Sequence, residues 1–510
     1  MNMQIRLNLS IIFFFCTFFL YSCSEQQDSL LIGESTVVKK SLSLTDKEVM
    51  SIAFDGDQTM TQSEAVTYIL PFIGSYDKQN SRAASNIHIG KADKDYLITN
   101  SNQNLSRSSL KENVDSVPLY EFLIDDQGKN FYALVSADKR SPGVLAFFDN
   151  FPKDKNRQLE CLNNPNMKAA LSLSKLQLLR DVEKVESVKC ELREKTINKI
   201  CNELRISRDE YSYGKVKNYI DSREQSSRNC EGVVMPQEQI VLKKGPLSNL
   251  LWEQGTPYNG ACPKANILFK VTDDWGFVQE GRVPAGCVTI ACMNIEACVG
   301  RSSIGGIPMD WDYYKKNRVL KEAQEGQTEG TPKLLLDRAQ KAISYVYDQL
   351  YSQSRYAEYE GKSYVSATES KFGTSYVKNN FNCGEEQKFD PDVVLSSLND
   401  YKPVYVEGYV YGTATDDHSQ YVYEGHAFVI DGYILTQKSS LYSIDELQSR
   451  AYLVKYYDMY WHLSLGWGET AGYFKLDSDA TCTPDFYDKY GRYNLINLQN
   501  MTIVPNISKK

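Results

Sequence analysis

The sequence predicts an α+β protein of two or three domains. Three observations lead to this prediction. Thr45 and Glu48 form a capping-box pattern within an apolar run, two alternating runs at 118–124 and 131–137 flank a polar turn, and a small-residue and apolar stretch after Cys287 precedes alternating strands further along the chain. A chain of 510 residues, 42% of them hydrophobic, is long enough to bury the cores of such domains.

The N-terminal elements are expected in a fixed order. Residues 40–155 should hold a helix over 44–53 and a β-hairpin over 118–137, which the run 138–148 follows. Residues 156–235 are rich in charge and carry leucines and valines at helical spacing, which predicts helices that link two larger parts. Within this linker, residues 221–229 are polar and lack periodicity, so we expect a maturation cut there.

The first residues resemble an export signal. Arg6 precedes an apolar run over 11–20 that is too short to span a bilayer, which predicts a signal peptide over 1–22. The motif Leu-Tyr-Ser-Cys at 20–23 resembles a bacterial lipobox, in which Cys23 becomes the lipidated first residue and 23–39 a tether. We therefore expect an exported lipoprotein at the outer membrane or cell surface, from which the catalytic part could be released. The alternative is an ordinary signal peptide that is cleaved nearby.

Charge argues against one class of partner. The net charge of −8 and the isoelectric point near 5.4 give no reason to expect binding to nucleic acid. A membrane is expected as a partner only through the lipid anchor.

Cys287 and His426 are the candidate catalytic residues. Gly286 and a small-residue and apolar run place Cys287 at the start of a buried helix, where the helix dipole stabilises a thiolate nucleophile. His426 heads an alternating apolar strand and could act as the base. Taken singly, each residue is more often structural. A metal site at Cys287, Cys292 and Cys298 is disfavoured, because their spacing lacks a metal-binding knuckle.

Four short sequence motifs together resemble those of the streptopain family of cysteine peptidases. They are Trp-x-Gln-x-x-Pro-Tyr-Asn at 252–259, Gly-Cys-Val at 286–288, Gly-His-Ala-x-Val-Ile-Asp-Gly at 425–432 and a Trp-Gly word at 467–468. The resemblance implies a papain-like catalytic domain over 236–510, with Cys287 as nucleophile and His426 as base. It further implies Gln254 as an oxyanion-hole donor, Trp467 packed beside the histidine, and no metal or other cofactor.

The resemblance extends, less specifically, to the N-terminal part. Residues 40–155 resemble the propeptide, or Spi-type inhibitor domain, of this family. The implied protein is a secreted cysteine endopeptidase made as a zymogen, with protein or peptide substrates and its own propeptide as an intramolecular inhibitor.

The sequence departs from the family where an Asn-Trp pair is replaced by Ser464 and Leu465. The asparagine would orient the catalytic imidazole, and Ser464 offers a shorter reach. His462 and Asp458 lie close by in sequence and could compensate. We expect an active and slow enzyme, because nucleophile and base remain. Two alternatives stay open: a pseudo-peptidase that binds proteins at the surface, and an acyl transferase or amidase that uses the same dyad.

Overall fold

The structure is a computed structural model in which every described residue belongs to one compact unit that begins at Ser41. The predicted signal peptide (1–22), Cys23, the tether (23–39) and the maturation stretch 221–229 lie outside the described residues. The structure describes residues 42, 44–54, 58–75, 88–89, 93–99, 116–126, 129–216, 238–263, 282, 284–322, 330–351, 357–359, 362–364, 371–414, 421–440, 454–476, 486–488, 491–493 and 501–510.

The N-terminal part contains the predicted helix and hairpin. Its described elements are α1 (Asp46–Ala53), α2 (Gln62–Gly74), β1 (His88–Ile89), β2 (Asp93–Thr99), β3 (Ser116–Asp126), β4 (Lys129–Ser136), β5 (Gly143–Phe148), α3 (Lys155–Asn163), α4 (Pro165–Leu204) and the 3-10 helix η2 (Arg208–Glu210). Thr45 caps α1, and the Glu48 carboxylate accepts a 2.7 Å hydrogen bond from the Thr45 N–H, which confirms the capping box. Strands β3 and β4 pair antiparallel, which confirms the hairpin.

The linker contains most of α3 and the long helix α4. Helix α4 runs without interruption over 40 residues. Leu171, Leu176, Leu179 and Val182 are at most 2% exposed, because the apolar side of the helix packs against the sheet. The predicted helical spacing is thereby confirmed.

The C-terminal part begins with one strand, continues with helices and ends with strands. Its described elements are β6 (Gln239–Lys244), α6 (Cys287–Val299), β7 (Ser303–Ile304), β8 (Ile307–Pro308), α7 (Trp311–Lys316), α8 (Lys333–Tyr351), β9 (Ala357–Tyr359), β10 (Lys362–Tyr364), α9 (Lys371–Asn380), β11 (Phe381–Asn382), β12 (Gln387–Lys388), α10 (Pro391–Asn399), β13 (Val404–Ala414), β14 (Tyr421–Ser440), β15 (Val454–Ser464), η3 (Gly468–Thr470), β16 (Gly472–Phe474), β17 (Phe486–Asp488), β18 (Gly491–Tyr493), β19 (Thr502–Val504) and β20 (Ser508–Lys509). Helices and an antiparallel sheet together confirm the α+β class.

One local expectation needs correction. His426 lies inside β14, which begins five residues earlier at Tyr421, because pairing with β13 extends the strand past the apolar run. Trp467 lies in the turn after β15, where it caps η3 and forms an isolated bridge with Glu253.

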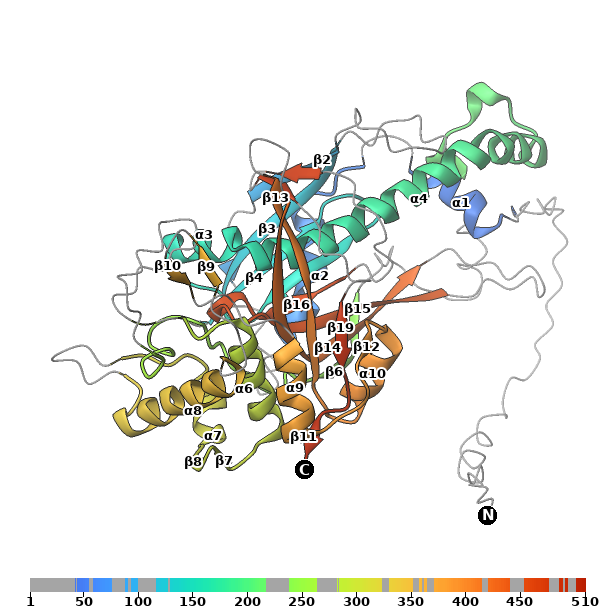
Figure 1. The fold of residues 1–510 in the computed structure, drawn as a ribbon. Helices are drawn as coiled ribbons and strands as arrows, with labels where there is room; N and C mark the ends of the chain where they lie inside the picture. Colours follow the sequence, from blue (N-terminus) through green and yellow to red (C-terminus); the bar gives the residue numbers. More distant parts are fainter. Residues whose placement is uncertain are drawn as a thin grey trace, which may run out of the picture. The chain divides into compact units, whose positions relative to one another are not determined.

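One antiparallel sheet runs through both parts of the chain (Figure 1). Among the described residues it has 14 strands, in the order β12-β19-β13-β14-β15-β16-β5-β4-β3-β2-β17-β18, with β1 added to β3 and β6 to β14. The N-terminal strand β5 joins the C-terminal strand β16, with Phe147 opposite Tyr473 and Ala146 opposite Phe474. The separate domains predicted at 40–155 and 236–510 therefore share a sheet, and their boundaries remain a prediction.

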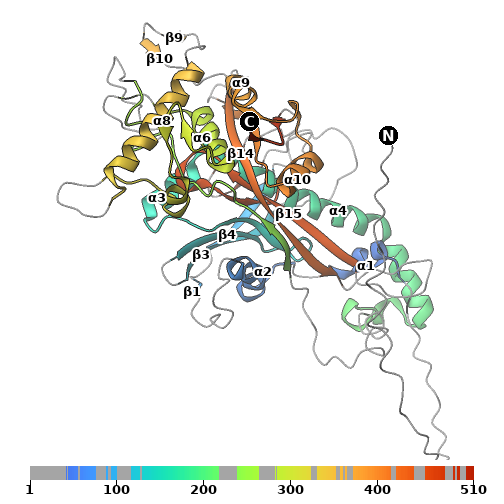
Figure 2. The same ribbon diagram turned by 90° about the horizontal axis from the view of Figure 1, so that it is seen from below.

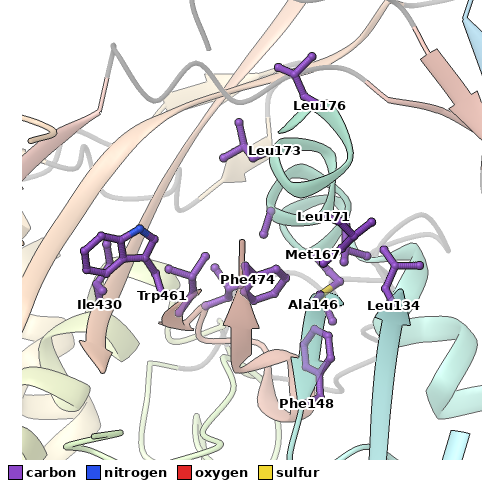
Figure 3. Close-up of a cluster of buried hydrophobic side chains, with 14 of the residues drawn as sticks. Leu134, Ala146, Phe148, Met167, Leu171, Leu173, Leu176, Ile430, Trp461 and Phe474 are labelled. Atoms are coloured by element: carbon purple, nitrogen blue, oxygen red, sulfur yellow. The ribbon is translucent and has the colours of Figure 1, made fainter. Parts of the chain in front are cut away.

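The main core is shared as well. Figure 3 shows Phe148 of β5 and Met167 and Leu171 of α4 beside Phe474 of β16, with Trp461 of β15 close by. On the other side of β3 and β4, helix α2 covers a second cluster, so that α2 and α4 lie on opposite faces of these strands (Figure 2). Burial of large apolar side chains on both faces holds the N-terminal strands to the C-terminal sheet.

A separate cluster surrounds α6. Its buried residues come from α6, α8 and α9 and from the α6-facing side of β13 and β14, among them Tyr405, Ala427 and Val429. Eleven of the 13 residues of α6 are buried, and most of them are apolar, as expected for a helix that is enclosed by the core. This packing fixes the first residue of α6, Cys287, against the sheet.

Candidate active site

Cys287 is the first residue of α6. Gly286 caps the helix with φ of +83°, a conformation that a glycine adopts without strain. The Cys287 side chain is largely buried, and no acidic residue lies in the first turn. The N–H groups of the first helical turn have no partner within the helix, so they favour negative charge at this position.

Gln254 is tied to the start of this helix by the main chain. The N–H of Ala285 donates a 2.8 Å hydrogen bond to the carbonyl oxygen of Gln254. The Gln254 side chain is 7% exposed, and its Nε2 has no hydrogen-bond partner among the described residues. Because a buried amide donor is rarely left unsatisfied, this group is available for an acceptor that the described part of the chain does not supply.

A third segment, the turn after β15, completes the site. Gly466 has φ of +74°, and a Cβ there would lie 3.2 Å from Cγ2 of Ile290 on α6. The N–H of Gly468 donates to the carbonyl of Trp252 at 3.2 Å, and Trp467 pairs with Glu253 in an isolated bridge. The Gln254 loop, the start of α6 and the Trp467 turn therefore converge.

His426 is buried on β14, next to the end of β15. The main chain of Leu465 hydrogen-bonds to its ring, while Nε2 has no partner among the described residues. Burial lowers the pKa of His426 to about 4, and the bond to Leu465 opposes this only partly. The ring is therefore a neutral imidazole at pH 7.

The alternation of β14 separates His426 from the residues that touch α6. The His426 ring stacks on Phe428, with centroids 6.0 Å apart, and Phe428 belongs to the core shared with α4. Ala427 and Val429 belong to the α6 cluster together with Cys287. The two candidate catalytic residues thus lie on adjoining elements, but the imidazole is on the Phe428 side of its strand.

Comparison with known proteins does not assign the chain to a family. The sequence matches no protein-family model, and it has no significant match among curated proteins.

Ser464 does not take the orienting role that its position suggested. It is 3% exposed and lies opposite Val429 in the strand register, and within the described part of the chain no hydrogen bond joins it to His426. The bond to the ring comes instead from the main chain of the next residue, Leu465. A main-chain group is independent of side-chain identity, so sequence comparison could not have found it.

The two suggested compensating residues are engaged elsewhere. Nδ1 of His462 lies 2.5 Å from Oδ1 of Asp431. Asp458 forms an ion pair with Lys475 at 3.0 Å. Neither bond orients His426.

Sequence reasoning missed the buried cluster around Asp431. Its Oδ2 accepts hydrogen bonds from the N–H and the hydroxyl of Ser248, at 2.9 and 2.8 Å. Burial alone would raise the pKa of Asp431, but His462 and Ser248 hold it below its usual range. The cluster connects β14 and β15 to the loop after β6. The motif Ile-Asp-Gly at 430–432 contains the signal, because an acidic residue within an apolar strand needs buried partners.

Other site types receive no support in the described ranges. There, no cluster of three or more His, Cys, Asp or Glu side chains could hold a metal ion, and no helix is long and apolar enough to cross a membrane. A cavity of about 900 Å³ lies between α2 and β6, and the residues that line it include none of the candidate site residues.

Proposed function

We propose that this chain is a cysteine endopeptidase with a papain-like catalytic part, made as a zymogen. The observation that supports the proposal is the main-chain hydrogen bond between Ala285 and Gln254, which ties the residue with a buried amide, unpartnered among the described residues, to the segment two residues before the thiol at a helix N-terminus. A nucleophile and an oxyanion donor held by one backbone contact are what acyl transfer needs.

The proposed chemistry is peptide-bond hydrolysis through an acyl-enzyme. The Cys287 thiol gives its proton to His426, and the sulfur attacks the peptide carbonyl carbon. The Gln254 amide and the N–H of Cys287 stabilise the resulting oxyanion. His426 returns the proton to the leaving amine as the C–N bond breaks, and water then hydrolyses the thioester.

We propose that the N-terminal part keeps this site catalytically inactive. It adds β5 to the edge strand β16, and Asp149 forms a two-bond ion pair with Arg318, both bonds at 3.1 Å. The neutral His426 ring on the Phe428 side of β14 suits a resting precursor, because a thiolate–imidazolium pair needs both groups within about 3 Å. We propose that loss of the N-terminal part frees the ring to approach Cys287.

Export as a lipoprotein through Cys23 is also proposed. Substrates would be proteins or peptides outside the cytoplasm, and the mature catalytic part would be released by cleavage near 221–229. Mass analysis of the membrane fraction tests the anchor, because Cys23→Ser would remove a diacylglyceryl mass.

A time course of the full chain tests the proposed activity. Wild type, Cys287→Ala and His426→Ala would be followed by intact mass and labelled with an epoxide warhead. We expect wild type to cut itself between about 220 and 240 and to be labelled at Cys287, while both variants stay whole. If the wild-type chain stays whole, does not cleave casein and reacts with the epoxide no faster than an ordinary thiol does, the peptidase proposal fails.

The pseudo-peptidase remains the second candidate, and one observation favours it. The His426 ring is bonded to the Leu465 main chain and stacked on Phe428, which would be its permanent place in a binding module. Epoxide labelling separates the two, since only a competent dyad accelerates it.

A further inference from the structure

An arginine of the N-terminal part binds beside the candidate oxyanion loop. Arg157 lies on α3, and its Nη2 is 3.5 Å from Oε2 of Glu253, the residue immediately before Gln254. Its Nη1 bonds to Glu160 of the same helix at 3.0 Å. Arg157 thus brings a guanidinium from the proposed linker, within the N-terminal part, to the loop that would hold the oxyanion.

Two acidic residues of the C-terminal part, Glu253 and Glu469, interact electrostatically with Arg157. The Glu253 side chain is 18% exposed and lies against Gly468, where a Cβ would be only 3.1 Å from Oε2. Glu469 follows directly in η3. Burial raises the pKa of Glu469, the charge of Arg157 opposes this, and the charge of Glu253 adds to it, so the three groups interact.

Glu253 and Glu469 both lie close in sequence to the residues that would surround the scissile peptide bond of a substrate. Glu253 bridges to Trp467 through the main chain, and Glu469 lies two residues beyond Trp467. The adjoining Gln254 amide, buried and unpartnered, marks where a substrate carbonyl oxygen would sit. A side chain close to the scissile bond would therefore come within reach of both carboxylates.

We propose that Glu253 and Glu469 form a subsite for a lysine or arginine side chain of the substrate, occupied in the precursor by Arg157. This inference rests on the proposed peptidase function. Departure of the N-terminal part would leave two half-buried carboxylates without their guanidinium. Such groups favour a replacement cation, and arginine can meet carboxylates with two parallel hydrogen bonds.

Peptide cleavage by the self-processed chain tests the subsite. A peptide mixture rich in internal lysine and arginine would be digested and the cut positions read by mass spectrometry. We expect a basic residue to be enriched at one fixed position relative to the cut bond. Paired peptides with arginine or uncharged citrulline at that position should differ in kcat/KM by about tenfold or more, mainly through KM.

Three variants make the test specific. Glu253→Gln and Glu469→Gln should bring the arginine-to-citrulline ratio towards one. The control is Glu386→Gln, which removes an exposed carboxylate that is paired with Lys378 at 2.9 Å and should leave the ratio unchanged.

The outcomes separate the two proposals. An active peptidase without preference for a basic residue overturns the subsite and leaves the peptidase function standing. A preference that survives both glutamine variants also overturns it. If either variant fails to fold, the wild-type ratio decides alone: a ratio near one rejects the subsite. Absence of both cleavage and epoxide labelling overturns both proposals.

Discussion

The His426 ring hydrogen-bonds to the main chain of Leu465, one residue beyond the serine that replaces the family's asparagine. The group that holds the ring of the proposed base in the precursor is therefore part of the backbone at the end of β15. The strand pairing that leads up to it, with Ser464 opposite Val429, fixes where this group lies.

Ser464→Ala should therefore change the rate of epoxide labelling of Cys287 by less than about threefold. The Ser464 hydroxyl makes no hydrogen bond to His426 among the described residues, and removal of a hydroxyl without such a bond costs little. His426→Ala is the control and should reduce labelling to the rate of an ordinary thiol. Equal losses in both variants would restore Ser464 as the orienting residue.

Gln254→Ala should lower kcat by about 10²–10³-fold, as expected when one oxyanion donor is lost. Labelling by a warhead that needs no oxyanion should be kept, because the thiol and the imidazole remain. The matched control is Gln158→Ala on α3, whose amide bonds to the carbonyl of Pro152. Peptide turnover and labelling, measured side by side, check the prediction; a parallel loss of both would mean that Gln254 is structural.

The precursor should lose stability in acid through His426. Its folded pKa, about 4, lies below the ordinary 6.5, so the unfolded chain binds more protons between these values. His426 therefore contributes about 3 kcal/mol to the free energy of unfolding. This contribution is fully present above pH 6.5 and declines as the pH falls towards 4. Urea midpoints at pH 7.5 and 5 should differ less in His426→Gln than in wild type; equal differences would contradict the prediction.

Gly472→Ala should loosen the N-terminal part. A Cβ at Gly472 would lie 2.6 Å from Cδ1 of Phe148 and 2.9 Å from the carbonyl oxygen of Phe147, where β16 meets β5. We expect faster proteolytic release of the N-terminal part in a Cys287→Ala background, measured with an added protease. Gly300→Ala is strained at φ of +70° but meets no neighbour, so it is a control for a general loss of stability.

Asp431→Ala should destabilise the whole chain by about 3–5 kcal/mol, because it leaves His462 and Ser248 buried without their partner. Asp400→Ala, which removes an exposed ion pair with Lys402, should cost less than about 1 kcal/mol. Urea unfolding of both variants checks the contrast.

The sequence alone determined the local elements whose signals are short-range. The capping box at Thr45 and the alternation on both sides of the polar stretch 125–130 depend on neighbours a few residues apart, so α1 and the hairpin of β3 and β4 were predictable. The apolar run after Cys287 likewise predicted a buried helix with the thiol at its first residue.

Only the tertiary structure decided what brings distant segments together. That β5 joins β16 follows from edge-strand pairing, which leaves no pattern in either strand. The hydrogen bond of Ala285 to Gln254 and that of His426 to Leu465 use main-chain groups. Because every residue has such groups, no sequence motif identifies the ones that form these bonds. Residue types identified the candidates for catalysis, whereas backbone geometry decided which groups surround them.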